Sequence, residues 1–84
     1  MNHVAVEQFW SLYEKLPLAI QKSADNSFMT IKQHPNHPLL RLVRNDNLVS
    51  MRIGSRCRAI GVEEGETTVW FWIGTYKQFS NFYK

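Results

Sequence analysis

The segment LVSMRIGSRCRAIGVEEGETTVWFWIG, residues Leu48–Gly74, decides the fold of this 84-residue chain. Apolar and polar residues alternate along Leu48–Ile53 and again along Arg56–Val62, which is the pattern of half-buried β-strands. Thr67–Gly74 is a nearly continuous apolar run, which is typical of a central strand covered on both faces. Only short turns separate these runs, and turns this short join antiparallel neighbours. The segment therefore predicts an antiparallel meander.

The residues before this segment predict one more strand and two helices. LLRLVR, at Leu39–Arg44, predicts a strand that ends in a tight turn at Asn45–Asn47. Closer to the N-terminus, apolar residues recur at helical spacing, which predicts helices at about Ala5–Leu16 and Pro17–Ile31. Such helices bury an apolar face. The prediction is therefore an α+β fold with two N-terminal helices packed on one face of a four-stranded antiparallel sheet.

The alternation also assigns side chains to the two faces of the sheet. Toward the helices we expect Val49, Met51, Ile53, Cys57 and Ala59. On the opposite face we expect Ser50, Arg52, Arg56 and Arg58. A one-residue slip in register would exchange the two sets, so these positions test the strand pairing directly.

The composition is that of a small globular domain. A chain of this length forms one unit, so we treat residues 1–84 as a single domain. Hydrophobic residues make up 44% of the chain and aromatic residues 13%, which is enough for a packed core and argues against general disorder. A single cysteine, Cys57, can form neither an internal disulfide nor a metal cluster. No pattern indicates a signal peptide or a membrane span, so we expect a cytoplasmic protein without a membrane partner.

The arginines are concentrated in one part of the chain. All of them lie between Leu39 and Ile60, at Arg41, Arg44, Arg52, Arg56 and Arg58. The net charge of +3 is too mild to indicate nucleic acid by itself. Arginine, however, binds phosphate well because its planar fork donates two parallel hydrogen bonds. Arginines beside the aromatic strand indicate an RNA-binding surface. One alternative is that the arginines only form a solvated sheet face. Another is that Trp70 and Trp72 are core residues.

Other kinds of site have little support in the sequence. No phosphate-binding glycine loop, dinucleotide motif or HExxH zinc motif is present. His34 and His37 lie three residues apart without an evident third ligand, and Pro35 and Pro38 favour a rigid turn there. The acids at Glu63–Glu66 fit a solvated turn. We therefore expect no metal and no cofactor.

Four stretches of the chain, taken in order, resemble the RelE/ParE superfamily of bacterial toxins from type II toxin–antitoxin systems. They are FWSLYEKLP, NHPLLRL, VSMRIGSRCRAIG and VWFWIGTYKQF, which cover most of the sequence. The resemblance implies two helices against a curved antiparallel sheet whose exposed face is functional. It implies a cognate antitoxin protein as a partner. It also implies that the long N-terminal strand of many members is reduced here to a few residues around His3–Val6.

The resemblance assigns catalytic roles to Arg52, Arg58 and Tyr76. Arg58 matches the arginine that contacts the scissile phosphate in nuclease members, and Arg52 matches the arginine before it. Tyr76 occupies the place where nuclease members often carry histidine or arginine. A tyrosine hydroxyl is a poor general base at neutral pH because its reference pKa is about 10. The candidate RNA-binding residues are Arg44, Arg56, Lys77 and Tyr83.

The resemblance leaves three functions open. The first is a metal-independent endonuclease that cuts mRNA on the ribosome, in which the 2′-hydroxyl of the RNA attacks the adjacent phosphate and Arg52 and Arg58 stabilise the developing charge. The second is a ParE-like inhibitor of DNA gyrase without catalytic activity. The third is an inactive homologue that retains only antitoxin binding. We favour the first.

Overall fold

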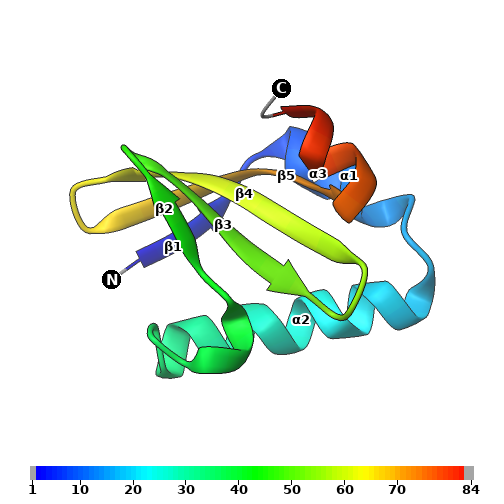
Figure 1. Ribbon diagram of the computed structural model, residues 1–84, viewed down its shortest axis with the longest axis horizontal. Coiled ribbons are helices and arrows are strands. Elements are labelled where there is room, and N and C mark those ends of the chain that lie inside the picture. Colours follow the sequence, from blue (N-terminus) through cyan, green and yellow to red (C-terminus); the bar gives the residue numbers. More distant parts are fainter. Residues whose placement is uncertain (1, 83–84) are drawn as a thin grey trace.

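The computed structural model describes residues 2–82 (Figure 1). Its strands are β1 (Asn2–Ala5), β2 (Val43–Asn45), β3 (Leu48–Ile53), β4 (Cys57–Glu64) and β5 (Thr67–Thr75). Its helices are α1 (Glu7–Glu14), α2 (Leu18–Gln33), the 3-10 turn η1 (Pro38–Leu40) and α3 (Tyr76–Phe82). Within the described residues, no helix is long and apolar enough to cross a membrane.

The two N-terminal helices lie within a few residues of the predicted bounds. Pro17 separates them, with an extended backbone that suits the residue before a helix, and its carbonyl accepts hydrogen bonds from Ile20 and Gln21. The side-chain amide of Gln21 reaches back and donates to the carbonyls of Tyr13 and Leu16, at 3.2 and 3.1 Å. These bonds satisfy carbonyls at the end of α1 that lack a partner inside the helix. Proline and glutamine thus set the angle between the helices.

The strands form one mixed sheet with the order β1-β5-β4-β3-β2. The antiparallel meander of β3, β4 and β5 is confirmed, and β2 pairs antiparallel with β3. Within residues 2–82 the sheet has five strands, one more than predicted, because β1 pairs parallel with β5. Four residues are too few to show an alternating pattern, so periodicity did not reveal β1. Its position matches the short N-terminal strand that the family resemblance implied.

The segment predicted as a strand at Leu39–Arg44 is mostly a turn. Pro38–Leu40 forms η1, and the imidazole Nδ1 of His37 accepts a hydrogen bond from the backbone of Leu39 at 3.2 Å. Leu40 is buried, whereas Leu39 is exposed. The first part of this apolar run therefore forms a capped turn, in which Leu40 is the buried side chain. Strand pairing begins only at Val43.

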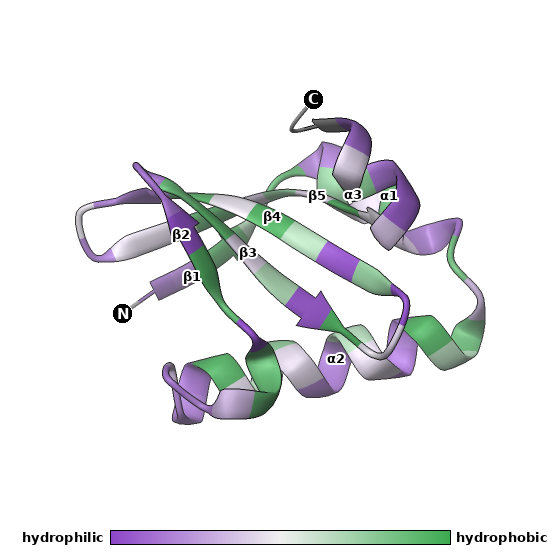
Figure 2. Ribbon diagram, viewed as in Figure 1, coloured by the Kyte–Doolittle hydropathy of each residue, from purple (hydrophilic) through white to green (hydrophobic). Residues whose placement is uncertain are grey.

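The core lies between the sheet and the two N-terminal helices. The predicted helix-facing set is buried there, together with Phe9 of α1 and Ala24 and Ile31 of α2. That set is Val49, Met51, Ile53, Cys57 and Ala59. Along β3 and β4 the ribbon colours include both apolar and polar residues (Figure 2), and Arg52 and Arg58 each lie between apolar neighbours. The strand register predicted from the sequence is therefore confirmed.

A β-bulge in β5 separates the two tryptophans of the aromatic strand. The pairing shifts from Ile60 opposite Trp72 to Gly61 opposite Trp70, so Phe71 is the extra residue. Residues two apart in a regular strand share a face, but this shift puts Trp70 in the helix-side core and Trp72 on the opposite face. Only Trp72 therefore lies on the face that carries the arginines.

Gly74 is expected to be intolerant of a side chain because the ring of Trp72 lies directly over it. A Cβ at Gly74 would come within 2.6 Å of that ring and 2.7 Å of the Gln78 amide oxygen. Gly74→Ala should lower the free energy of unfolding by about 1–3 kcal/mol, the usual cost of overpacking, as measured by urea denaturation.

Gly65→Asn is the control for this substitution. The turn at Gly65 has open space around a Cβ and a left-handed backbone that asparagine tolerates. We expect its urea midpoint to stay near that of the original chain. Equal midpoints for the two variants would contradict the packing of Trp72 over Gly74.

Candidate functional site

A cavity of about 340 Å³ opens on the sheet face that points away from the core. Its lining comes from the loop before β2, the start of β2, strands β3 and β4 with the turn between them, and the start of α3. The lining residues are Arg41, Val43, Arg52, Ser55, Cys57, Arg58 and Tyr76. The structure thus brings together the side chains predicted as catalytic, Arg52, Arg58 and Tyr76.

Arg52 and Arg58 are direct cross-strand partners. They occupy opposing positions of β3 and β4, so their side chains project from the same face of the sheet, as predicted. Like charges at opposing positions destabilise a sheet, and an anion bound between them would remove that penalty. Arg52 is half-buried, and its Nε donates to the carbonyl of Gly54 at 2.7 Å. That hydrogen bond directs the side chain along the turn after β3.

Arg58 is the buried centre of the site. Only 4% of the residue is exposed. Its Nη2 donates to the carbonyl of Arg41 at 2.8 Å and to the hydroxyl of Ser50 at 2.9 Å. The guanidinium also lies over the rings of Phe79 and Tyr76, 5.3 and 5.9 Å from their centroids. A buried charge is tolerated only with such partners. Arg58 therefore links β3, the η1–β2 loop and α3.

Tyr76 is held at the junction of β5 and α3. Its backbone N–H donates to the carbonyl of Arg56 at 2.6 Å. Thr75 and Gln78 bond reciprocally, since the amide oxygen of Gln78 accepts from the Thr75 backbone and the hydroxyl of Thr75 accepts from the Gln78 backbone. This arrangement is a capping box, which fixes the start of the helix. The ring of Tyr76 remains 52% exposed, at the rim of the cavity.

The three predicted RNA-binding residues that the structure describes do not line this cavity. Arg44, on β2, forms an exposed ion pair with Glu63, with 3.0 Å between its Nε and the carboxylate. Arg56 is exposed just before β4, and Lys77 is exposed on α3. Tyr83 lies outside the described residues. The role of this set therefore stays a prediction.

Sequence reasoning missed several residues of the site, and Arg41 and Ser50 are the two that contact Arg58 by hydrogen bonds. Arg41 was expected in a strand, but its backbone is left-handed and its carbonyl faces Arg58. Ser50 was expected on the outer face, where it lies, but nothing in the sequence indicated its hydrogen bond to a buried guanidinium. The clustering of arginines could have indicated Arg41, and the alternation, which places Ser50 on the same face as Arg52 and Arg58, could have indicated Ser50.

The chemistry of the cavity is that of an anion site. Guanidiniums supply positive charge, and Ser55 and Tyr76 supply hydroxyl groups. Burial raises the pKa of the Cys57 thiol, so Cys57 stays protonated at neutral pH and is a weak nucleophile. In the described part of the chain, no cluster of three His, Cys, Asp or Glu residues could hold a metal ion.

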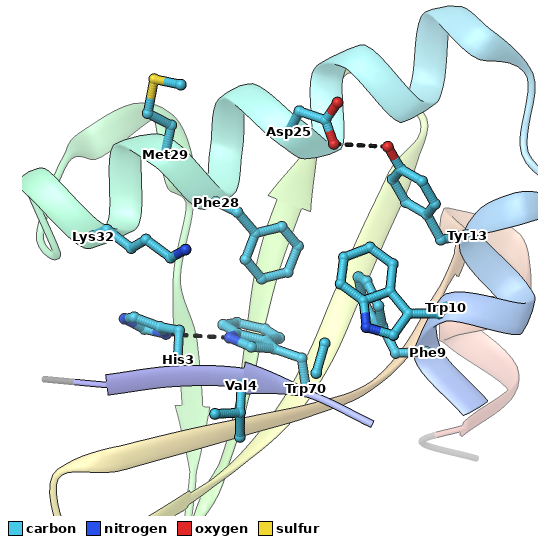
Figure 3. A pocket seen from close by; sticks show the side chains of 11 residues that line it. His3, Val4, Phe9, Trp10, Tyr13, Asp25, Phe28, Met29, Lys32 and Trp70 are labelled. Carbon is cyan, nitrogen blue, oxygen red and sulfur yellow. Dashed lines mark hydrogen bonds between the residues drawn. The ribbon is translucent and has the colours of Figure 1, made fainter. Parts of the chain in front are cut away.

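A second cavity, of about 320 Å³, lies on the helical side between β1, α1 and α2 (Figure 3). Aromatic rings dominate its lining, and Val4, Trp10 and Met29 are exposed around it. Among its polar groups, Tyr13 and Asp25 pair with each other, whereas the buried Nε2 of His3 has no hydrogen-bond partner within residues 2–82. The hydroxyl of Tyr13 donates to Asp25 at 2.7 Å, which raises the pKa of Tyr13. This cavity is chemically distinct from the arginine cavity on the other face.

His3, at the edge of this second cavity, is expected to make stability depend on pH. The indole N–H of Trp70 donates to its Nδ1 at 3.2 Å, so Nδ1 must be unprotonated. Burial, followed by the charge of Lys32, lowers the pKa of His3 below 6.5. The unfolded chain therefore binds the proton more tightly. The contribution of His3 to stability is complete above pH 6.5 and is lost as the pH falls through 6.5 toward the lower folded value.

His3→Asn keeps an acceptor for the indole but does not titrate. We expect its urea midpoint to change less than that of the original chain between about pH 7.5 and about pH 5.5. Other groups titrate in both proteins, so the difference between the two pH profiles is the measured quantity. Identical profiles would contradict the assignment.

Comparisons with known proteins agree on the fold. The sequence matches no family model, and no curated protein matches it in sequence. The structure is similar to the RelB–RelE antitoxin–toxin complex from Methanococcus jannaschii, with a TM-score of 0.71, 16% identity, and coverage of 96% of this chain and 99% of that one. For the YoeB/ParE toxin from Agrobacterium tumefaciens the TM-score is 0.67 at 16% identity, covering 90% and 99%.

The isolated RelE toxin of E. coli is similar over an even larger share of this chain. Its TM-score is 0.67 at 11% identity, and the match covers 99% of this chain and 98% of that one. At such identities the shared property is the arrangement of the backbone. The chain therefore has the fold of the RelE/ParE toxins.

Proposed function

We propose that this protein is the toxin of a toxin–antitoxin system and that it acts in the cytoplasm as a ribosome-dependent mRNA endonuclease. The observation that carries this proposal is the cavity in which Arg52 and Arg58 oppose each other beside Tyr76. The fold supports it, because structural neighbours include toxin–antitoxin complexes from Mycobacterium tuberculosis and E. coli. By analogy with those complexes, a cognate antitoxin is the proposed protein partner.

The proposed reaction begins with the RNA itself. The 2′-hydroxyl attacks the adjacent phosphate, and the 5′-oxygen of the next nucleotide leaves, so the products are a 2′,3′-cyclic phosphate and a 5′-hydroxyl. The phosphorane carries extra negative charge, which Arg52 and Arg58 stabilise. This route needs no metal, because the nucleophile is internal and guanidiniums supply the positive charge.

The proton transfers are divided between the protein and its surroundings. The hydroxyl of Tyr76, at the rim of the cavity, is placed to donate a proton to the leaving oxygen or to orient a base. The lining includes no carboxylate and no imidazole. We assign acceptance of the 2′-hydroxyl proton to a group outside the chain, with the ribosome supplying the geometry of attack. Arg44, Arg56 and Lys77 are the proposed contacts to flanking RNA.

Arg52→Ala is the first test of this function. Arg52 is half-buried and bonds only to a turn carbonyl among the contacts described, so its loss should change stability by less than about 1 kcal/mol. Cleavage of mRNA on translating ribosomes should fall by about 10²-fold or more. Lys22→Ala, an exposed cation on α2, is the charge-matched control and should cleave normally.

Bacterial cells in which the chain is induced distinguish the nuclease from the two other candidate functions. Growth arrest, mRNA cleavage and plasmid supercoiling are measured together after induction of the original chain. Arrest with intact mRNA and altered supercoiling would replace the nuclease with a gyrase inhibitor. No effect on any of the three would leave an inactive homologue that only binds antitoxin.

Tyr76→Phe separates the hydroxyl of Tyr76 from its ring. The ring beside Arg58 is kept, so folding should be unchanged. If the hydroxyl transfers a proton, cleavage should fall by about 10²-fold or more, whereas binding to ribosomes should persist. Normal cleavage by this variant would restrict Tyr76 to packing against the guanidinium.

A further inference from the structure

Arg41 lies where two cavities meet. It lines the arginine cavity together with Arg52. It also lines a neighbouring cavity of about 310 Å³ that is bounded by His37 in the turn before it and by Arg44 on β2. The residue is exposed. Its position therefore connects the candidate reaction site to the surface beside it.

The backbone of Arg41 is held in a conformation that arginine does not favour. Its φ is 49° and its ψ is 48°, in the left-handed region. Within the described chain, Asp46 is the other non-glycine residue with a positive φ, and it lies in a tight turn where aspartate tolerates that geometry. No such preference applies to Arg41. Unfavourable backbone conformations persist where surrounding contacts impose them, and they cluster at functional sites.

Arg41 is the left-handed C-cap of η1, and two hydrogen bonds hold its backbone there. The buried Nη2 of Arg58 donates to the carbonyl of Arg41 at 2.8 Å, and the backbone N–H of Arg41 donates to the carbonyl of Pro38 at 3.2 Å. Ser50 accepts from the same Nη2 and so fixes the guanidinium from the β3 side. Because Arg58 is buried and anchored on a central strand, it is a rigid support for the loop.

The charge around Arg41 is positive on both sides. The residues that line the two cavities, all in the described part of the chain, include no Asp or Glu. Arg44 is paired with Glu63, which partly neutralises it. Arg41 and Arg52 are then the guanidiniums that an incoming polyanion meets at this junction. Two adjoining anion-binding cavities fit consecutive phosphates of one strand better than a single small anion.

We propose that Arg41 binds a phosphate of single-stranded RNA that flanks the one held at Arg52, and that Arg58 is the positioning residue that holds Arg41 in place. This inference rests on the proposed RNA substrate. It adds to that proposal a second phosphate site at Arg41. It also adds a role for Arg58, which is to hold Arg41 in place.

The first experiment measures RNA binding without cleavage. The probe is a short single-stranded RNA with 2′-O-methyl groups, which removes the nucleophile, and its affinity is followed by fluorescence anisotropy from low to high salt. Arg41→Ala should weaken binding about tenfold at low salt and reduce the slope of log K against log salt by about 0.7, the value for one phosphate contact on a single strand. Lys22→Ala should change neither quantity, and Arg41→Lys should restore part of the affinity.

The second experiment tests how Arg58 acts. In a double-mutant cycle, Arg58→Lys alone should weaken RNA binding about as much as Arg41→Ala, and the double variant should bind no more weakly than either single one. Additive losses would mean that Arg58 contributes to binding of this probe independently of Arg41, and would overturn its positioning role. If Arg58→Lys does not fold, Ser50→Ala is used in the same cycle with the same expectations, because it removes the anchor of the guanidinium.

The outcomes separate this inference from the proposed function. An unchanged affinity and salt slope in Arg41→Ala would overturn the phosphate role of Arg41, whatever the chain does to mRNA. RNA binding that depends on Arg41 but without cleavage on ribosomes would support the inference and contradict the nuclease. An original chain that does not bind the probe at low salt would overturn the phosphate site at Arg41, whereas the nuclease is tested separately by cleavage on ribosomes.

Discussion

The burial of the Arg58 guanidinium is the constraint on which the arrangement of this surface depends. A charge with 4% of its residue exposed must find partners, and here they come from three separate parts of the chain. The carbonyl of Arg41, the hydroxyl of Ser50 and the rings of Phe79 and Tyr76 surround it. Because these partners lie in the η1–β2 loop, β3 and α3, one side chain contacts three of the segments that border the arginine cavity.

The β-bulge in β5 is a second constraint, and it keeps the two faces of the sheet chemically distinct. The bulge at Phe71 sends Trp70 into the helix-side core and leaves Trp72 on the arginine side. Gly61 and Gly74 give these two rings room, since a Cβ at either position would meet an indole. The aromatic strand thus stabilises both layers, and the arginine face can carry charge without weakening the core. The same division separates the aromatic cavity on the helical side from the arginine cavity.

Much of the fold could be predicted from the sequence, because alternation and helical spacing are local signals. They gave the positions of both helices, the three-stranded meander and the inward direction of Met51 and Ala59. The rest depends on contacts between distant segments. The parallel strand β1 is defined by its partner β5, and the turn at Pro38–Leu40 by the burial of Leu40. The candidate site was predicted as a set of residues, whereas the burial of Arg58 was not, since α3 and the η1–β2 loop cover it.

The central claim is that this cavity holds the phosphate at which RNA is cut. The chemical nature of the cleaved ends tests it most directly. A message translated in the presence of the purified chain is recovered, and the termini of its fragments are identified. Attack by the 2′-hydroxyl predicts 2′,3′-cyclic phosphate and 5′-hydroxyl ends, and their loss in Arg52→Ala. An intact message, or fragments with 3′-hydroxyl and 5′-phosphate ends, would contradict the account.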